Sequence, residues 1–387
     1  AVSRKDNGLP DTSNISPVAT NFGYFSGGNN ESLVHRVDYT NDTATASTKG
    51  PLSSGTSAAG ATGNASFGYV GGGESPTKST VDRIDYGNDT ATASVKGPLS
   101  LARLYLAATG NSSFGYFGGG SPGPYSTIDR VDYSNDTATA VAKGPLSSVR
   151  YYMAATGNAN FGYFGGGNPS VQSTVRRVDY SNDTVTTPEK GPLTLARGRL
   201  AATGNSSFGY FGGGFPGPFS TVDRVDYSND TATAVAKGPL SVTRERLSAT
   251  GNADFGYFSG GQNPSQLSTI DRVDYSNDTA TASPKGPLTV TRTLQAASSA
   301  AANALPTNTG LLTLLFSASD PRDNVVPQGT DFGYFGGGFP GPKSTIDRID
   351  YSNDTATASP KGPLGAAERQ AAATSSSSFG YFATSVN

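Results

Sequence analysis

The stretch FGYFGGGSPGPYSTIDRVDYSNDTATAVAKGPL, residues 114–146, decides the fold of this 387-residue chain, because the chain repeats it. Its opening tripeptide, Phe-Gly-Tyr, occurs eight times, and Arg-Val/Ile-Asp-Tyr occurs seven times. Each copy of the second motif is followed by Asn-Asp-Thr and then by Lys-Gly-Pro-Leu. The unit is about 47 residues long, and the copies of Phe-Gly-Tyr begin at Phe22, Phe67, Phe114, Phe161, Phe208, Phe255, Phe332 and Phe379.

Four short extended runs are expected in each unit, and in the quoted copy they are residues 106–109, 114–117, 127–133 and 137–142. Glycine, asparagine, aspartate and proline separate the runs, and these residues favour turns and strand ends. We name the four strands a, b, c and d. Four antiparallel strands at a period of 40 to 50 residues are typical of a propeller blade.

The motif also resembles a known repeat. An apolar strand ending in Gly-Gly-Gly, a variable loop, Thr-Ile-Asp-Arg-Val-Asp-Tyr-Ser-Asn-Asp-Thr and a Gly-Pro-Leu exit resemble the kelch motif across nearly all of residues 16–387. The form Phe-Gly-Tyr-Phe-Gly-Gly-Gly is similar to kelch-like repeat proteins of marine tailed phages of the cyanophage type, and that resemblance implies a place in the virion. The chain departs from the kelch pattern because it contains no Trp.

We therefore predict an all-β, seven-bladed, kelch-like β-propeller of four-stranded antiparallel blades. It would span residues 16–387, after an N-terminal extension at residues 1–15. The seven c–d pairs set the blade number, and the N- and C-terminal Phe-Gly-Tyr strands are expected to close the ring in one composite blade. One of the eight Phe-Gly-Tyr strands is then surplus, and the alternative is a longer protein with an eighth blade. One interval of 77 residues, from Phe255 to Phe332, predicts an insertion at about residues 300–330, between a strand a and the next strand b.

The composition excludes several functions. Charged residues are 15% of the chain and the formal net charge is -2, so we expect no nucleic-acid partner. The absence of Cys and the single His exclude thiolate and multi-histidine sites, so we predict no metal, no cofactor and no enzymatic activity. No apolar run approaches the roughly 18 residues that a membrane span needs.

Variation among the copies points to a binding face. The a–b and c–d turns hardly change, whereas the b–c loops and the d–a segments, which share the opposite face, change freely. Aromatic side chains there suit sugar rings or protein surfaces, although they could instead only cap the tops of the blades. The predicted partner-binding residues are Tyr105, Tyr125, Tyr151, Tyr152, Phe215, Phe219, Phe339 and Lys343.

The insertion carries a second candidate surface. Its apolar side chains have no place in a regular blade, so they are expected to dock on a neighbouring subunit or to fold back onto the propeller. These residues are Leu311, Leu312, Leu314, Leu315 and Phe316.

Three tempting chemical signals have structural explanations. His35 stands where other copies have Asp or Arg, which suggests a solvated position. The run Asp132 to Asp136 lacks the Gly and Glu of a calcium loop, so an Asx-type turn is favoured. The repeated Arg-x-Asp pairs are expected to bridge neighbouring blades, with Arg reaching backbone or carboxylate groups. Representative pairs are Arg83 and Asp85, Arg130 and Asp132, and Arg224 and Asp226.

The sequence thus predicts a non-enzymatic virion structural or receptor-recognition protein, such as a tail-fibre, baseplate or decoration component, located on the extracellular particle. Its expected partners are other virion or assembly proteins and a host-surface glycan or protein, and self-association into a homo-oligomer is compatible with it. The alternative is a secreted or cell-surface repeat protein of a microbe that binds carbohydrate or forms filaments.

Overall fold

The computed structural model describes residues 21–123 and 125–301 and, beyond them, the backbone of five strands between residues 332 and 384. The chain divides into two compact units, residues 1–311 and residues 312–387. No helix in the described part of the chain is long and apolar enough to cross a membrane.

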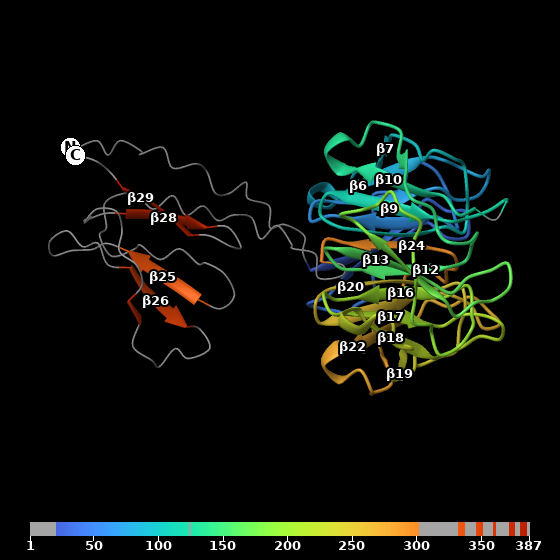
Figure 1. The fold of residues 1–387 in the computed structure, drawn as a ribbon. Coiled ribbons are helices and arrows are strands. Elements are labelled where there is room, and N and C mark those ends of the chain that lie inside the picture. The colour runs from blue at the N-terminus through green and yellow to red at the C-terminus, as the bar shows by residue number, and fades with distance from the viewer. Residues whose placement is uncertain are drawn as a thin grey trace, which may run out of the picture. The chain divides into compact units, whose positions relative to one another are not determined.

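The first unit is a six-bladed β-propeller in which each blade is a four-stranded antiparallel sheet. Figure 1 shows this unit from the side, coloured from blue at its N-terminal strands to orange at β24. The inner strands of successive blades lie side by side around a central channel, and the last of them, β24, lies beside β4. Blade 1 contains β24 (Ala296–Ser299), β1 (Phe22–Ser26), β2 (Val34–Asp38) and β3 (Ser47–Lys49). Blade 2 contains β4 (Gly60–Gly63), β5 (Phe67–Gly71), β6 (Val81–Asp85) and β7 (Ser94–Lys96).

The remaining four blades repeat the same order of strands. Blade 3 contains β8 (Ala107–Gly110), β9 (Phe114–Gly118), β10 (Ile128–Asp132) and β11 (Val141–Ala142). Blade 4 contains β12 (Ala154–Gly157), β13 (Phe161–Gly165), β14 (Val175–Asp179) and β15 (Glu189–Lys190). Blade 5 contains β16 (Ala201–Gly204), β17 (Phe208–Gly212), β18 (Val222–Asp226) and β19 (Val235–Lys237), and blade 6 contains β20 (Ser248–Gly251), β21 (Phe255–Ser259), β22 (Ile270–Asp274) and β23 (Ser283–Pro284).

The repeated sequence explains the layering of the blades. Strand a is built from Ala, Thr, Gly and Ser, whose small side chains fit the crowded centre of the ring. Strand b carries two successive buried side chains, both aromatic except for Val70 in blade 2, and they point to opposite faces of the sheet because successive side chains alternate. In blade 3, Tyr116 packs toward blade 4 and Phe117 packs toward blade 2. Each blade therefore contributes bulk to both of its interfaces.

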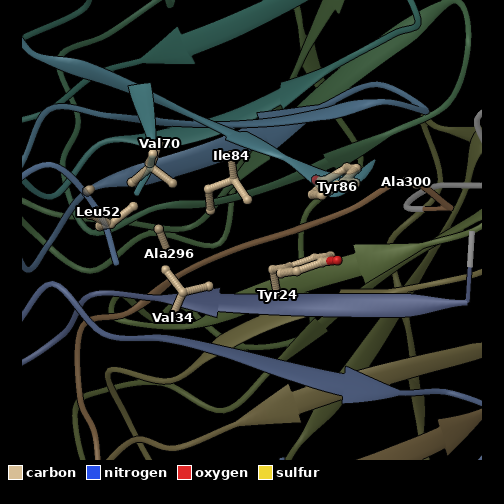
Figure 2. Close-up of a cluster of buried hydrophobic side chains, with 10 residues drawn as sticks. Tyr24, Val34, Leu52, Val70, Ile84, Tyr86, Ala296 and Ala300 are labelled. Atoms are coloured by element: carbon tan, nitrogen blue, oxygen red, sulfur yellow. The ribbon is translucent and has the colours of Figure 1, made fainter. Parts of the chain in front are cut away.

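Figure 2 shows one such interface, between blades 1 and 2. Tyr24 and Val34 from blade 1 face Val70, Ile84 and Tyr86 from blade 2. The two tyrosine rings stack with their centroids 4.7 Å apart. Aromatic pairs of this kind stabilise by about 1 kcal/mol beyond the area that they bury, so the blades are joined by apolar packing as well as by polar contacts.

The prediction of seven blades is wrong. The strand-a segment of the seventh repeat, Ala296–Ser299, pairs with β1 of the first repeat and not with the strand at Phe332. The first repeat has no strand a of its own, so β24 completes blade 1 and closes the ring after six blades. The prediction that the C-terminal Phe-Gly-Tyr strand at Phe379 closes the ring is also wrong, because β24 occupies that place beside β1. The 77-residue interval therefore marks the end of the ring and not an insertion within it.

The second unit contains a three-stranded sheet and a two-stranded sheet. β25 (Phe332–Gly336), β26 (Ile346–Asp350) and β27 (Ser359–Pro360) form the first, and β28 (Ala371–Ser375) and β29 (Gly380–Thr384) form the second. β25 and β26 pair in the same register as strands b and c of the propeller. The predicted N-terminal extension, Phe339, Lys343 and the apolar residues Leu311 to Phe316 lie outside the described residues.

Candidate functional site

A closed ring of six backbone hydrogen bonds surrounds one end of the central channel. The N–H of one residue just before each inner strand donates to the carbonyl of its counterpart in the neighbouring blade, at 2.8 to 2.9 Å. All six residues have φ between 56° and 59°, a left-handed conformation that only glycine adopts without strain. The members of this channel-mouth ring are Ala58, Tyr105, Tyr152, Arg199, Arg246 and Leu294.

The channel below the ring has a volume of about 140 Å³. The residues that follow the ring members, such as Leu106, Met153 and Gln295, line its upper part, and strand-a residues such as Ala108 and Thr203 line the rest. Ring closure fixes the backbone at the mouth identically in all six blades, whereas the side chains there are Ala, Tyr, Tyr, Arg, Arg and Leu. A rigid frame thus presents a variable set of side chains.

Three of those side chains assemble into a continuous surface with their neighbours. The ring centroids of Tyr105 and Tyr152 lie 3.9 Å apart, and those of Tyr151 and Tyr152 lie 5.4 Å apart. The guanidinium carbon of Arg199 lies 5.1 Å from the centre of the Tyr152 ring and 4.5 Å from the centre of the Phe215 ring. We name Tyr105, Tyr151, Tyr152, Arg199 and Phe215 the tyrosine–arginine strip.

Carboxylates border the strip at both ends. Glu245 accepts hydrogen bonds from Arg199 at 3.1 and 3.2 Å and from the amide of Gln262 at 3.1 Å. At the other end, Glu74 accepts the hydroxyl hydrogen bond of Tyr105 at 3.3 Å. Burial raises the pKa of Tyr152 well above its ordinary value, with the Tyr105 hydroxyl as a second cause, so this phenol stays neutral. The surface combines flat rings with fixed hydrogen-bonding groups.

The predicted binding residues divide into two groups. Tyr105, Tyr151, Tyr152 and Phe215 are brought together in the strip, and Phe215 is 37% exposed. The carbonyls of Tyr125 and Phe219 accept the N–H groups of Arg150 and Arg244, so the backbone of these two residues helps to hold the loops of the face. A binding role for their side chains stays a prediction.

Sequence reasoning missed the charged members of the site. Arg199 and Glu245 lie in the variable d–a segments of the predicted binding face, but the aromatic criterion for the predicted binding residues does not select charged side chains. The signal was available: Arg199 occupies the same repeat position as Tyr105 and Tyr152, one period further along. Glu74 and Gln262 come from b–c loops whose relation to the mouth is visible only in three dimensions.

A different set of repeated residues joins the blades. In each interface the Asp of Asn-Asp-Thr accepts a Tyr hydroxyl, an Arg guanidinium and a Lys ammonium from the preceding blade. Asp183, for example, accepts from Tyr116 at 2.9 Å, from Arg130 at 2.8 Å and from Lys143 at 3.2 Å. We name this set the inter-blade ladder, and its six acceptors are Asp42, Asp89, Asp136, Asp183, Asp230 and Asp278.

The Arg-x-Asp pairs contribute to the ladder through their arginines. Arg83 contacts Asp136, and Arg224 contacts Asp278, each in the next blade. The aspartates Asp85, Asp132 and Asp226 have another task, since each accepts the N–H of the residue two positions later at 2.9 Å. That contact confirms the Asx-type turn, and it precedes the short 3₁₀ turns Tyr86–Asn88, Tyr133–Asn135, Tyr227–Asn229 and Tyr275–Asn277.

The prediction that His35 is solvated is wrong. His35 and its counterparts Asp129, Asp223 and Asp271 are fully buried. In three blades a buried Arg pairs with the buried Asp. In blade 1 the Nε2 atom of His35 instead shares a hydrogen bond of 2.7 Å with the hydroxyl of Thr289. Burial, with Arg292 nearby, lowers the pKa of His35 to about 4. Substitution here reflects a change of partner inside the blade and not exposure to solvent.

Comparison with known proteins identifies no family for this chain. No family model matches the chain, and no curated protein matches it. Among the described residues, no three His, Cys, Asp or Glu side chains lie close enough together to hold a metal ion. The fold is a six-bladed β-propeller of four-stranded antiparallel blades.

Proposed function

We propose that the chain is a non-enzymatic recognition protein whose propeller presents the tyrosine–arginine strip to a glycan on a host surface. The observation that carries the proposal is the contrast at the channel mouth, where six identical backbone positions hold different side chains. Loops and segments displayed on a rigid scaffold are common sites of recognition. Closure of the ring uses only backbone groups, so the side chains at these positions can differ from blade to blade.

The chemistry of the strip favours a sugar. The face of a tyrosine ring provides apolar area, and the ring loses little entropy on binding because it has only two side-chain torsions. Arg199, Glu245 and Gln262 are already held by mutual hydrogen bonds, so they can meet sugar hydroxyls without reorganisation. Arginine between two aromatic rings also gives the strip a charged centre.

The setting follows from the resemblance to kelch-like proteins of tailed phages. In that setting the protein is a structural or receptor-recognition component of the virion, in contact with other virion proteins. The repeated Tyr, Arg, Lys and Asp residues are used as contacts between blades, and this supports the proposal that the protein has no enzymatic activity. The second setting, a secreted or cell-surface carbohydrate-binding protein of a microbe, uses the same site.

A glycan array probed with the full chain tests the site. The double variant Tyr105→Ala/Tyr152→Ala should lose about tenfold or more in apparent affinity, because buried aromatic anchors dominate such interfaces. Val141→Ala, which alters an exposed apolar residue on the outer strand β11, is the matched control and should bind as the parent does. Equal binding by the double variant would refute the site, and binding only to proteins would refute the ligand class.

Mass spectrometry tests the setting separately. The chain should be recovered from purified virions in stoichiometric amount. Recovery from the culture medium or the cell surface of a microbe, with no virion association, would favour the second setting and leave the glycan site untouched.

A further inference from the structure

Three blades share a buried ion pair near the b–c/d–a face. Arg103 contacts Asp129 at 2.8 Å, Arg197 contacts Asp223 at 3.0 Å, and Arg244 contacts Asp271 at 2.8 Å. All six side chains are fully buried. A buried carboxylate needs such a partner, because its desolvation costs several kcal/mol.

Blade 3 shows what surrounds the guanidinium group. Besides Asp129, Arg103 donates to the carbonyls of Phe117 at 3.0 Å, Gly119 at 3.0 Å and Thr127 at 2.8 Å. The positive charge thus lies in a shell of oxygen atoms: one carboxylate oxygen and three carbonyl oxygens.

Blade 2 keeps the shell and lacks the arginine. Moving back one repeat of 47 residues, Thr56 replaces Arg103, and Asp82 replaces Asp129. Strands β5 and β6 pair in the same register as β9 and β10, so the carbonyls of Val70, Gly72 and Thr80 occupy the positions of those that bind Arg103. The other two departures, in blades 1 and 4, change the carboxylate and retain the arginine.

The space left by the arginine is a small cavity of about 10 Å³. Thr56, Val70, Gly72, Thr80 and Asp82 line it. Asp82 is 5% exposed, and its carboxylate accepts hydrogen bonds from Ser53, including one from the Ser53 N–H to Oδ2 at 3.1 Å. In blade 3 the matching Oδ2 of Asp129 also accepts from Arg103, and no arginine does so in blade 2. The Thr56 hydroxyl, in a side chain equally buried, has no hydrogen-bond partner among the described residues.

The geometry points to a binding site for a monovalent metal cation, K⁺ or Na⁺, in this cavity, with Asp82, Thr56 and the three carbonyls as oxygen ligands. The volume is about that required by one particle of the size of water. The ion replaces the guanidinium charge that the other blades supply through the chain. It therefore neutralises a buried carboxylate and stabilises blade 2.

The charge around the cavity favours a monovalent ion. Asp82 is the single carboxylate that lines it, whereas Ca²⁺ takes six to eight oxygen ligands, usually with several carboxylates. Lys78 also borders the cavity, and its ammonium donates to the Ser54 hydroxyl and to the Gly55 carbonyl. That nearby positive charge further disfavours a divalent ion. Burial is the largest cause that raises the pKa of Asp82, and the hydrogen bonds from Ser53 and the charge of Lys78 act against it.

Thermal unfolding of the full chain in KCl, NaCl and choline chloride, at an equal ionic strength of about 0.15 M, tests the site. K⁺ or Na⁺ should raise the melting temperature by about 2 °C over choline, which is too large for the cavity. The salt with the larger effect identifies the ion. Equal melting temperatures in the three salts would mean that the cavity holds only water, and would overturn the assignment.

Two variants locate the effect. Thr56→Arg restores the arginine of the other blades and should remove the difference among the salts, and Asp82→Asn should remove it by deleting the charge. Asp129→Asn, the matched change in blade 3, should lower the melting temperature in all salts while the difference among them persists. A difference that persists in both blade 2 variants would place the ion elsewhere and refute the site.

A direct measurement covers the case in which a variant does not fold. Crystals of the parent chain soaked in thallium(I), a heavy analogue of K⁺, should show anomalous density between Asp82 and Thr56. A cavity without that density after soaking would refute the site.

Discussion

The inter-blade ladder and the channel-mouth ring each occur six times in the same propeller, but the ladder keeps its side chains constant and the ring keeps only its backbone geometry constant. In the ladder every interface uses the same residues, Tyr, Arg and Lys on Asp. In the ring every blade uses the same backbone hydrogen bond with unlike side chains. The difference teaches that side-chain identity holds the blades together, whereas backbone geometry alone closes the mouth and leaves its side chains available for binding.

The strongest way to break this comparison is to remove one ladder acceptor. Asp183→Ala leaves Tyr116, Arg130 and Lys143 without their carboxylate, and we expect a loss of about 4 kcal/mol in the free energy of unfolding, because a largely buried charge pair is broken. Urea unfolding measures it. Asp254→Asn, which alters an exposed carboxylate in an a–b turn, should change stability by less than about 0.5 kcal/mol. Similar losses in the two variants would contradict the role of the ladder.

Close packing at the same interface gives the next largest effect. The N–H of Gly144 donates to the carbonyl of Asp183, and a Cβ at Gly144 would overlap the carbonyl oxygen of Val185 in the next blade. Gly144→Ala should cost about 3 kcal/mol, measured by the same unfolding curves. Gly123→Ala is the control, because the nearest atom to its Cβ lies 3.8 Å away. A tolerated Gly144→Ala would show that the blades can separate locally.

Acid sharpens the comparison by weakening only blade 1. The pKa of His35 is lowered to about 4 in the folded chain from an ordinary 6.5, so the unfolded state binds more protons between these values. Stability due to neutral His35 is present above pH 6.5 and is lost as the pH falls toward 4. We expect a loss of about 2 kcal/mol between pH 7 and pH 5. His35→Gln should remove this part of the pH dependence, and an unchanged slope would refute it.

The smallest effect on stability is expected at the mouth. Phe215→Ala removes an exposed ring that contacts Arg199, and the free energy of unfolding should change by no more than about 0.5 kcal/mol. Glycan binding by the same variant should nevertheless weaken several-fold. A large loss of stability would show that the strip belongs to the structural framework and would end its separation from the ladder.

Much of the fold could be predicted from the repeated residues. Strand positions, the order a to d and the antiparallel blades follow from alternation and turn residues, and the residues of β9 and β10 show this directly. The blade number could not be predicted, because Ala296–Ser299 carries too little side-chain information to distinguish pairing with Phe332 from pairing with Phe22. A long connection after a strand lets it separate from the strand that normally follows.

The candidate site was predicted in part for a similar reason. Tyr105 and Tyr152 could be identified because aromatic residues stand out against a strand of Ala and Thr. The burial of His35 could not be seen at that position alone, since Asp, Arg and His all occur there. The signal lies in a second repeat position, that of Arg103, because three repeats combine Arg there with Asp at the position of His35, and opposite charges at paired positions indicate a buried interaction.

The closure of the ring by β24 also fixes how the protein can be tethered. In the other blades a tight turn joins strand a to strand b, but in blade 1 these strands come from distant parts of the chain, held by the Ser299 hydroxyl on the Phe22 carbonyl at 2.8 Å. The polypeptide therefore enters and leaves the toroid at one point, on the side of the a–b turns. Neither crossing point lies on the face of the b–c loops and d–a segments, which carries the tyrosine–arginine strip.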